Sequence, residues 1–262
     1  MKHQTLIASL SFALMATWSP SVRAHDAACC KPLNADAILK QMSDTLSASK
    51  EFSFKATREV SSEVAAEKHL QSKATIEVAV KRPQGMVSHS TSKDDVRSIY
   101  ADGKTLTIYD AKNNLYAAVP MKSTLDALPA KLSAGYGFVP PLVDFVVSDP
   151  YKAIKWRVTS MSYLGEATQS SGFLGLKKTK CHRLALSGKL ADAELWIGVA
   201  DHLPKQLVAT FKGAKDSGLK IAFTQWNLSA PPTDTSFTFT APKDAIAIPM
   251  MTADEIKSAW KN

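Results

Sequence analysis

Hydrophobic and polar residues alternate along most of this chain, and the alternation predicts a protein built mainly of β-strands. Residues 75–81 alternate most cleanly, with Ile76 and Val78 on one face. Similar runs predict strands at residues 51–55, 85–91, 96–101, 104–109, 115–119, 157–168, 178–187, 193–199, 205–212, 219–228 and 236–240. Turn pairs at residues 102–103 and 113–114 separate neighbouring runs, so consecutive strands are expected to be antiparallel.

Helical spacing replaces this alternation near the two ends of the domain. The first helix has one apolar face, and its cap is either Asn34 or Asp36. That face consists of Ile38, Leu39, Met42 and Leu46. Thr252 and Glu255 have the spacing of a capping box, which predicts a short helix at the C-terminal end.

Prolines divide residues 120–155 into short segments. Apolar spacing predicts one short helix around Leu128 and a second over residues 142–147, which begins after Pro140 and Pro141 and ends at residues 149–150. Continuous core helices rarely contain so many prolines, so residues 123–155 are interpreted as a movable lid. Its apolar side chains are Leu125, Leu128, Leu132, Leu142 and Phe145.

About ten strands with helices inserted between them predict a mainly β (α+β) fold. The expected architecture is a large curled antiparallel sheet, or incomplete β-barrel, with short helices covering one face. Such a sheet either packs solidly inside or leaves an apolar cavity suited to lipid-like ligands. The expected inward residues are Ile76, Val78, Leu106, Ile108, Leu195, Ile197, Leu207, Phe211, Ile221 and Phe223. A register slip of one residue would exchange this set for the opposite face.

The N-terminal residues have the pattern of a secretory signal peptide. Lys2 precedes an apolar run over residues 6–16, and Val22-Arg23-Ala24 forms a small-residue cleavage site. The run is too short for a spanning helix, which needs about 20 apolar residues. Residues 1–24 are therefore expected to be removed, leaving residues 25–262 as one domain in the periplasm of a Gram-negative bacterium. Acylation at Cys29 is the alternative, and Asp26 argues against it because an aliphatic residue would be expected there.

Charge and cysteine content narrow the choice of partners. The net charge is +8, but the lysines are dispersed, and the densest group, at residues 177–180, has no interleaved aromatic residue. The charge is therefore interpreted as favouring solubility, and no nucleic-acid partner is expected. In an oxidising compartment Cys181 is expected to form a disulfide with Cys29 or Cys30. The alternative is that Cys181 is a small buried hydrophobic residue with a free thiol.

No sequence motif for catalysis, metal binding or phosphate binding is present. His182 follows Cys181, but neighbours on a strand point to opposite faces, so the two cannot easily act together. His182 is expected to face solvent. Asp102 lies at a solvated hairpin tip, where its pKa has little reason to shift. The sequence therefore predicts a protein that is not an enzyme, with no catalytic residues, no metal and no cofactor.

Several segments resemble an uncharacterised family of predicted periplasmic proteins, classed as a domain of unknown function. The matching segments are residues 100–110, 114–117, 148–151, 181–182 and 225–228. The resemblance implies a fold similar to the lipoprotein carriers LolA and LolB, an incomplete barrel whose mouth is lidded by helices and whose cavity receives acyl chains. The sensor domain of the envelope-stress regulator RseB looks similar in fold.

Two functions follow from this resemblance. The first is non-enzymatic binding of a lipid, an acyl chain or a lipidated partner in the barrel cavity. The alternative is a periplasmic sensor or protein-interaction module of the envelope-stress type, with a membrane-associated protein partner. No functional residue of the carriers can be placed on this sequence.

Overall fold

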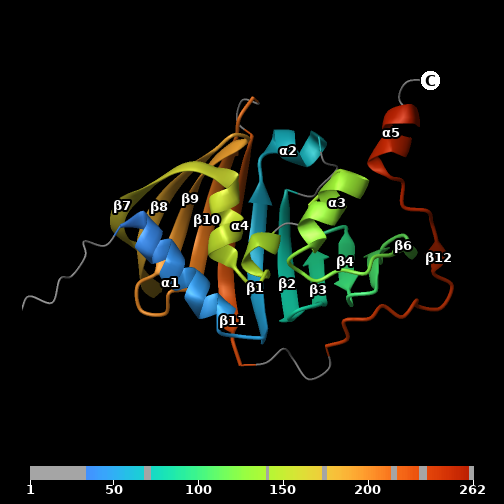
Figure 1. The fold of residues 1–262 in the computed structure, drawn as a ribbon, viewed down its shortest axis with the longest axis horizontal. Coiled ribbons are helices and arrows are strands. Elements are labelled where there is room, and N and C mark those ends of the chain that lie inside the picture. The colour runs from blue at the N-terminus through green and yellow to red at the C-terminus, as the bar shows by residue number, and fades with distance from the viewer. Residues whose placement is uncertain are drawn as a thin grey trace, which may run out of the picture. The chain divides into compact units, whose positions relative to one another are not determined.

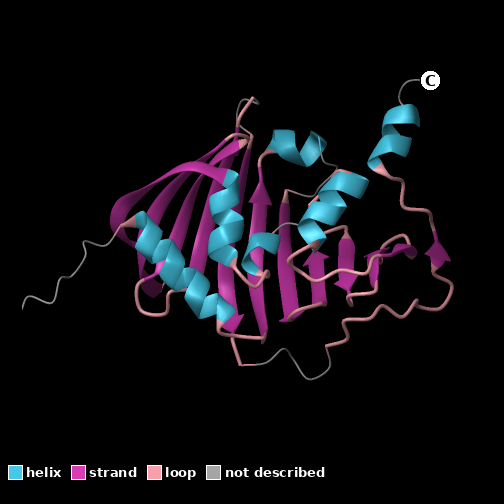
Figure 2. Cartoon of the chain, viewed as in Figure 1, coloured by secondary structure: helices cyan, strands magenta, loops and turns pink. Residues whose placement is uncertain are grey.

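Twelve strands form a single sheet in the computed structural model of the protein (Figures 1 and 2). The structure describes residues 34–67, 72–139, 142–172, 176–213, 217–229 and 235–259. The predicted signal peptide, Cys29 and Cys30 lie outside these residues. Along the sheet the order is β12-β6-β5-β4-β3-β2-β1-β11-β10-β9-β8-β7, and every neighbouring pair is antiparallel except β12 and β6.

The sheet consists of two antiparallel meanders. The first meander contains β1 (Glu51–Val60), β2 (Lys73–Lys81), β3 (Gly85–Thr91), β4 (Val96–Ala101), β5 (Thr105–Asp110) and β6 (Leu115–Pro120). The second contains β7 (Val158–Ser171), β8 (Lys177–Gly188), β9 (Ala191–Gly198), β10 (Pro204–Phe211) and β11 (Gly218–Asn227). Pairing between β1 and β11 joins them, with Phe54 opposite Trp226. The predicted curled antiparallel sheet is confirmed, and it remains open, with β7 and β12 (Ile246–Ala247) as its outermost strands.

Short helices lie on one face of the sheet (Figure 1). They are α1 (Ala35–Ser47), α3 (Leu128–Tyr136), the 3-10 helix η1 (Val143–Phe145) and α4 (Pro150–Arg157). Two further helices, α2 (Ser62–Glu67) at the end of β1 and α5 (Ala253–Ala259) beyond β12, lie at the margins of the sheet. None of the helices among the residues just given is long and apolar enough to cross a bilayer. We refer to the face of the sheet that packs against α1, α3 and η1 as the inner face.

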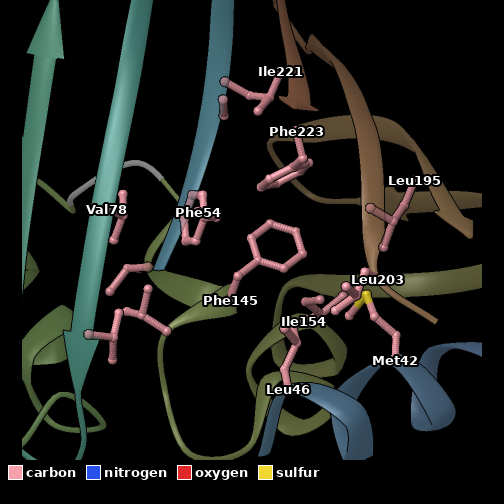
Figure 3. Close-up of a cluster of buried hydrophobic side chains, with 14 of the residues drawn as sticks. Met42, Leu46, Phe54, Val78, Phe145, Ile154, Leu195, Leu203, Ile221 and Phe223 are labelled. Atoms are coloured by element: carbon pink, nitrogen blue, oxygen red, sulfur yellow. The ribbon is translucent and has the colours of Figure 1, made fainter. Parts of the chain in front are cut away.

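The hydrophobic core lies between the inner face and these helices. Figure 3 shows Phe145 of η1 and Phe54 of β1 pointing toward Phe223 of β11, with ring-centroid distances of 5.3 and 5.6 Å. The predicted apolar face of α1 is buried here, and the Asn34 side chain caps the helix by accepting a hydrogen bond from the Ala37 N–H at 2.8 Å. Burial of this face, more than helix propensity, stabilises a helix of this length.

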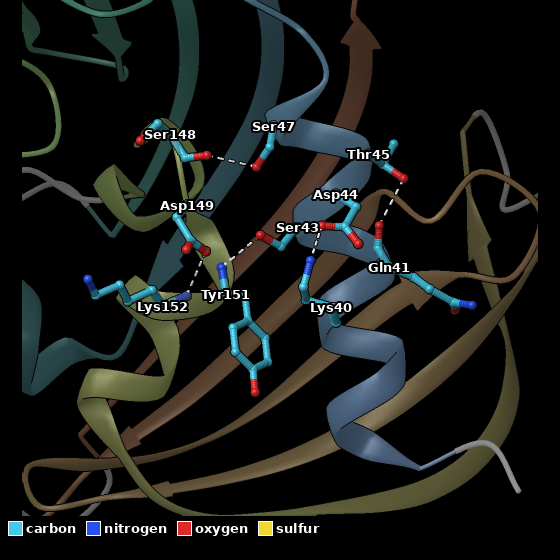
Figure 4. A network of polar contacts seen from close by, with 10 residues as sticks. All are labelled: Lys40, Gln41, Ser43, Asp44, Thr45, Ser47, Ser148, Asp149, Tyr151 and Lys152. Atoms are coloured by element: carbon cyan, nitrogen blue, oxygen red, sulfur yellow. Dashed lines mark hydrogen bonds and ion pairs between the residues drawn. The ribbon is translucent and has the colours of Figure 1, made fainter. Parts of the chain in front are cut away.

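Polar contacts fix α1 against α4 (Figure 4). The Ser43 hydroxyl accepts a hydrogen bond from the Tyr151 N–H at 2.9 Å, and the Ser47 hydroxyl donates to the Ser148 carbonyl at 2.8 Å. Asp149 caps α4 by accepting from the Lys152 N–H at 2.9 Å. The two helices therefore form one layer over the sheet.

Two predicted helix boundaries are wrong in the middle of the chain. Residues 142–147 form only the three-residue helix η1, because Leu142 adopts a left-handed conformation with φ of +64° and the carbonyls that follow η1 bond to Arg82. Asp149 and Pro150 begin α4 instead of ending a helix, with the proline at a first-turn position where a missing N–H costs nothing.

The predicted strand at residues 236–240 is also wrong. Phe237 and Phe239 alternate with polar residues because their rings pack on the outer face of the sheet, opposite the inner face. Phe239 lies among Tyr100, Tyr109 and Tyr116, with ring-centroid distances of 5.4, 5.3 and 5.2 Å. The chain then forms β12, which the sequence did not predict, and enters α5. The capping box of α5 is confirmed, because the Thr252 N–H donates to Glu255 at 2.7 Å.

Candidate ligand-binding site beneath the helical layer

A partly enclosed pocket of about 120 Å³ lies between the inner face of β1–β4 and the segment that contains η1. We call it the inner pocket. Its lining residues are Arg58, Ile76, Val78, Met86, Ser88, Ser90, Ser92, Asp95, Arg97, Ile99, Leu142 and Val146. One end of the inner pocket is lined by apolar side chains. The other end contains all of its charged lining residues.

Strand register explains why these side chains converge. Val78 pairs with Ser88 and Ser88 pairs with Ile99, so these three residues lie side by side across β2, β3 and β4 on the same face. Two residues further along, Ile76, Ser90 and Arg97 form the next row. Side chains two residues apart on a strand share a face, so the two rows together form the floor of the inner pocket.

The polar end is built from β1 and the β3–β4 hairpin. The Arg97 Nε lies 3.0 Å from an Asp95 carboxylate oxygen, and the Ser92 hydroxyl donates to the Asp95 carbonyl at 3.1 Å. Arg58 extends from β1 and is only 8% exposed. Burial lowers the pKa of Arg58, and the Asp95 carboxylate partly offsets this effect. A guanidinium nevertheless stays charged at neutral pH, because its ordinary pKa exceeds 12.

The segment over the inner pocket is held by one arginine. Arg82 donates to the carbonyls of Val146 at 3.0 Å and Val147 at 2.6 Å, and also to those of Leu46 at 2.6 Å and Ser49 at 2.8 Å. Its guanidinium lies 4.8 Å from the centre of the Phe52 ring. The roof of the pocket is thus tied to the C-terminal end of α1.

The ten residues expected to face a cavity all lie on the inner face. Seven of them are buried in the core and Leu207 packs against it, while Ile108 and Phe211 are half-buried. Only Ile76 and Val78 line the inner pocket. The other positions are filled by contacts with the helices and with neighbouring strands.

Of the five residues expected in a lid, most are also buried in the core and one lines the inner pocket. Leu125, Leu128, Leu132 and Phe145 are buried in the core, and Leu142 lines the inner pocket. Of the five, Leu142 alone therefore borders the inner pocket, and the other four fill the core beside it.

Sequence analysis did not identify the polar end of the inner pocket. The available signal was the alternation along β1, where Phe52, Phe54 and Ala56 are buried and Arg58 continues the same face. A charged residue that shares the buried face of a strand with apolar residues indicates either a polar binding site or an ion pair inside the protein.

His182 and Cys181 are both buried. The expectation that His182 faces solvent is wrong, because it lies two residues before Leu184 on the inner face and is 3% exposed. Its Nδ1 lies 3.1 Å from the Tyr163 hydroxyl. Among the described residues the Cys181 thiol forms no disulfide, and burial raises its pKa. Because its expected partners lie outside the described residues, the disulfide stays a prediction.

Three larger hollows lie at the surface of the described part of the chain, and one of them, of about 250 Å³, is lined by Phe237 and Phe239. One of about 550 Å³ lies on the outer face beneath residues 235–240, and one of about 800 Å³ lies between α3 and α4. The inner pocket is smaller than these three, but it is more enclosed and combines an apolar floor with charged groups, which is the character of a ligand site.

A curved antiparallel sheet with a helical layer on one face defines a mainly β fold. The family model described as "Predicted periplasmic protein (DUF2092)" matches residues 35–251, so the chain belongs to this family. Both the family and the periplasmic location inferred from the sequence are thereby confirmed. No curated protein matches the chain.

Several solved structures resemble the chain at low identity. An uncharacterised conserved protein from Thermus thermophilus is 14% identical, with a TM-score of 0.48 over 82% of this chain and 98% of that chain. The Pseudomonas aeruginosa MucA/MucB complex gives 15% identity and a TM-score of 0.43 over 79% of this chain and 61% of that chain. The LolA superfamily protein from Nitrosomonas europaea gives 10% and 0.34 over 76% of this chain and 96% of that chain. The fold assignment rests on strand order and register, not on these similarities.

Proposed function

We propose that this periplasmic protein is a non-enzymatic binding protein that holds the acyl chain of a lipid or a lipidated partner in the inner pocket. The observation that supports this most directly is a partly enclosed, largely apolar space beneath a short roof segment. Ile76, Val78 and Ile99 form its floor, and Leu142 and Val146 form its roof. An acyl chain needs such a surface, because burial of each methylene contributes about 0.8 kcal/mol.

The size of the inner pocket requires the roof to move. A volume of 120 Å³ is well below the roughly 300–1,000 Å³ of ordinary ligand pockets and is too little for a long acyl chain. Displacing Leu142 and Val146 would extend the pocket along the inner face toward Phe145. The contacts that oppose this displacement include those of Arg82 and a hydrogen bond from the Ser148 N–H to Asp126 at 2.7 Å. The ion pair between Arg157 and Asp144 of η1 at 2.9 Å and the burial of Val146 in the core also oppose it.

The residues of the inner pocket favour binding over catalysis. Its titratable groups are Arg58, Asp95 and Arg97, and Asp95 is engaged by Arg97. An activated nucleophile needs a base within hydrogen-bond reach, and the serines of this pocket are accompanied by no histidine or cysteine in its lining. Within the described part of the chain, no group of three or more His, Cys, Asp or Glu residues is placed to hold a metal ion.

A filled-pocket variant tests this function. Val78→Trp places an indole in the inner pocket, and Leu190→Trp, at an exposed hairpin position, is the matched control. We expect wild type and Leu190→Trp to bind dodecanoate or 1-monododecanoylglycerol in a fluorescence displacement titration, and Val78→Trp to lose at least ten-fold in affinity. Circular dichroism establishes that each variant is folded.

The proposal fails if wild type binds neither amphiphile, or if folded Val78→Trp binds as wild type does. Native mass spectrometry of protein purified from the periplasm provides an independent measurement. A co-purifying species that is released by solvent extraction and carries an acyl chain is the expected result.

A protein-binding module is the second candidate, and the groove between α3 and α4 favours it. Pro129 and Ala130 line one side of this groove, and Trp156, which is 89% exposed, lines the other. Exposed tryptophan is enriched where proteins bind one another. Trp156→Ala should weaken a stable periplasmic complex at least ten-fold without changing dodecanoate affinity, and unchanged complex formation would exclude this surface.

A further inference from the structure

We propose that the inner pocket selects amphiphiles with an anionic head group, a carboxylate or a phosphate, and places that head at the end formed by Arg58 and Arg97. This inference rests on the proposed function, since it assigns the head group of the ligand whose acyl chain the pocket takes.

Along the direction of the strands, the inner pocket changes from a buried apolar end to a charged end near solvent. Val78, Met86 and Val146 lie toward its deep end and are almost completely buried. Arg97 lies toward the β3–β4 hairpin, and its side chain is 44% exposed. A ligand that matches both ends therefore has its tail beneath the roof segment and its head near solvent.

The charge of the lining side chains favours an anion. Arg58 and Arg97 contribute two positive charges and Asp95 one negative charge, which gives a net charge of +1 for the lining residues. A neutral head would gain only ordinary hydrogen bonds at this end. A cationic head would lie beside two guanidinium groups.

Guanidinium geometry suits carboxylate and phosphate. Each guanidinium presents its N–H donors in a planar fork that can form two parallel bonds to such a group. Ser88 and Ser90 place hydroxyl groups on the floor between the arginines and the apolar end. Arg58 is surrounded by protein, so its interaction with an anion is screened less than at an exposed site.

Isothermal titration at pH 7.5 tests the head-group preference with ligands that share a twelve-carbon chain. Dodecanoate and dodecyl phosphate are the anionic probes, 1-monododecanoylglycerol is the neutral probe, and inorganic phosphate is the probe without a tail. We expect the anionic amphiphiles to bind about ten- to one-hundred-fold more tightly than the neutral one, the range for charge-assisted hydrogen bonds. Comparison of dodecanoate with dodecyl phosphate distinguishes the two head groups.

Arg58→Gln should remove most of this preference, measured as the ratio of the dodecanoate affinity to the 1-monododecanoylglycerol affinity of the same variant. Lys55→Gln, in the same strand but exposed on the outer face, is the matched control and should change nothing. Because Arg58 is buried, Arg97→Gln provides a second variant at a more exposed position, where a partial loss of preference is expected.

Three other results of these titrations would each overturn one of the two proposals. Equal affinity for neutral and anionic amphiphiles overturns the head-group inference and leaves the proposed function intact. Phosphate binding as tightly as dodecyl phosphate also overturns it, since the tail would then contribute nothing. No binding of any amphiphile, neutral or anionic, overturns the proposed function itself.

Discussion

The guanidinium of Arg82 donates a hydrogen bond to the Val147 carbonyl at 2.6 Å, and this contact joins the end of β2 to the roof of the inner pocket. The same guanidinium also bonds to three other backbone carbonyls, at residues 46, 49 and 146. Burial lowers the pKa of Arg82 to about 10, which leaves it charged at neutral pH. One side chain therefore satisfies carbonyls at the end of α1 and behind η1.

Replacement of Arg82 should destabilise the protein and loosen the roof. Arg82→Met leaves several carbonyls without their donor, and we expect a loss of about 2–4 kcal/mol in the free energy of unfolding. Arg82→Lys keeps the charge but not the planar fork, so it should recover less than half of that loss. Urea unfolding measures the loss, and hydrogen exchange at residues 142–148 should accelerate. A lysine variant as stable as wild type would contradict this account.

His89 predicts a pH dependence of stability. Burial lowers the pKa of His89, with the nearby Glu77 opposing the effect, and its Nδ1 lies 2.8 Å from the Ser98 hydroxyl. In the pH range between the folded and unfolded pKa values, the unfolded chain binds more protons, so stability rises with pH. The contribution is complete above the unfolded value of about 6.5 and is lost as the pH falls toward the folded value. Thermal unfolding of His89→Gln should vary less than wild type between pH 7.5 and 5, and an identical slope would exclude His89 as the cause.

Phe239 should anchor the C-terminal segment to the outer face. Phe239→Ala removes ring contacts with three tyrosines, and we expect a loss of about 1–3 kcal/mol. Limited proteolysis should then cleave between residues 235 and 250 faster than in wild type. Thr240→Ala, one residue away and exposed, is the control and should change neither quantity.

The disulfide prediction is decided by peptide mapping of protein purified from the periplasm under non-reducing conditions. A bridge from Cys181 to Cys29 or Cys30 should appear as one cross-linked peptide, and the same spectra test cleavage after Ala24. By the chain-entropy model such a bridge would contribute about 4–5 kcal/mol. Recovery of Cys181 as a free thiol would end the prediction.

The sequence pattern predicted most of the sheet. One face of each strand is buried, and this produces the alternation of apolar and polar residues from which strands are predicted. The pattern predicted α1 for the same reason, since four apolar residues share a buried face. It failed at residues 236–240, where aromatic side chains alternate on the sheet surface without strand pairing. It also misassigned Asp149 and Pro150, because a proline can either follow one helix or begin the next.

The candidate site was harder to predict than the fold. Ile76 and Val78 could be placed on the inner face, but whether a side chain fills space or borders it depends on what packs opposite. The roof depends on the left-handed backbone conformation of Leu142. The polar end depends on Arg58, whose burial could be inferred only from its position on the alternating buried face of β1. These are properties of tertiary contacts, which local periodicity does not contain.

The pairing of β1 with β11 has a consequence for how the protein reaches its native state. Ser53 lies opposite Asn227, so the central seam of the sheet closes only after almost the entire chain is available. High contact order slows folding, because the entropy of closing a long loop is lost before the pairing compensates for it. During translocation across the inner membrane, β1 would emerge early and wait with an unpaired edge. Until β11 arrives, that edge is the part of the sheet most open to pairing with a strand of another chain.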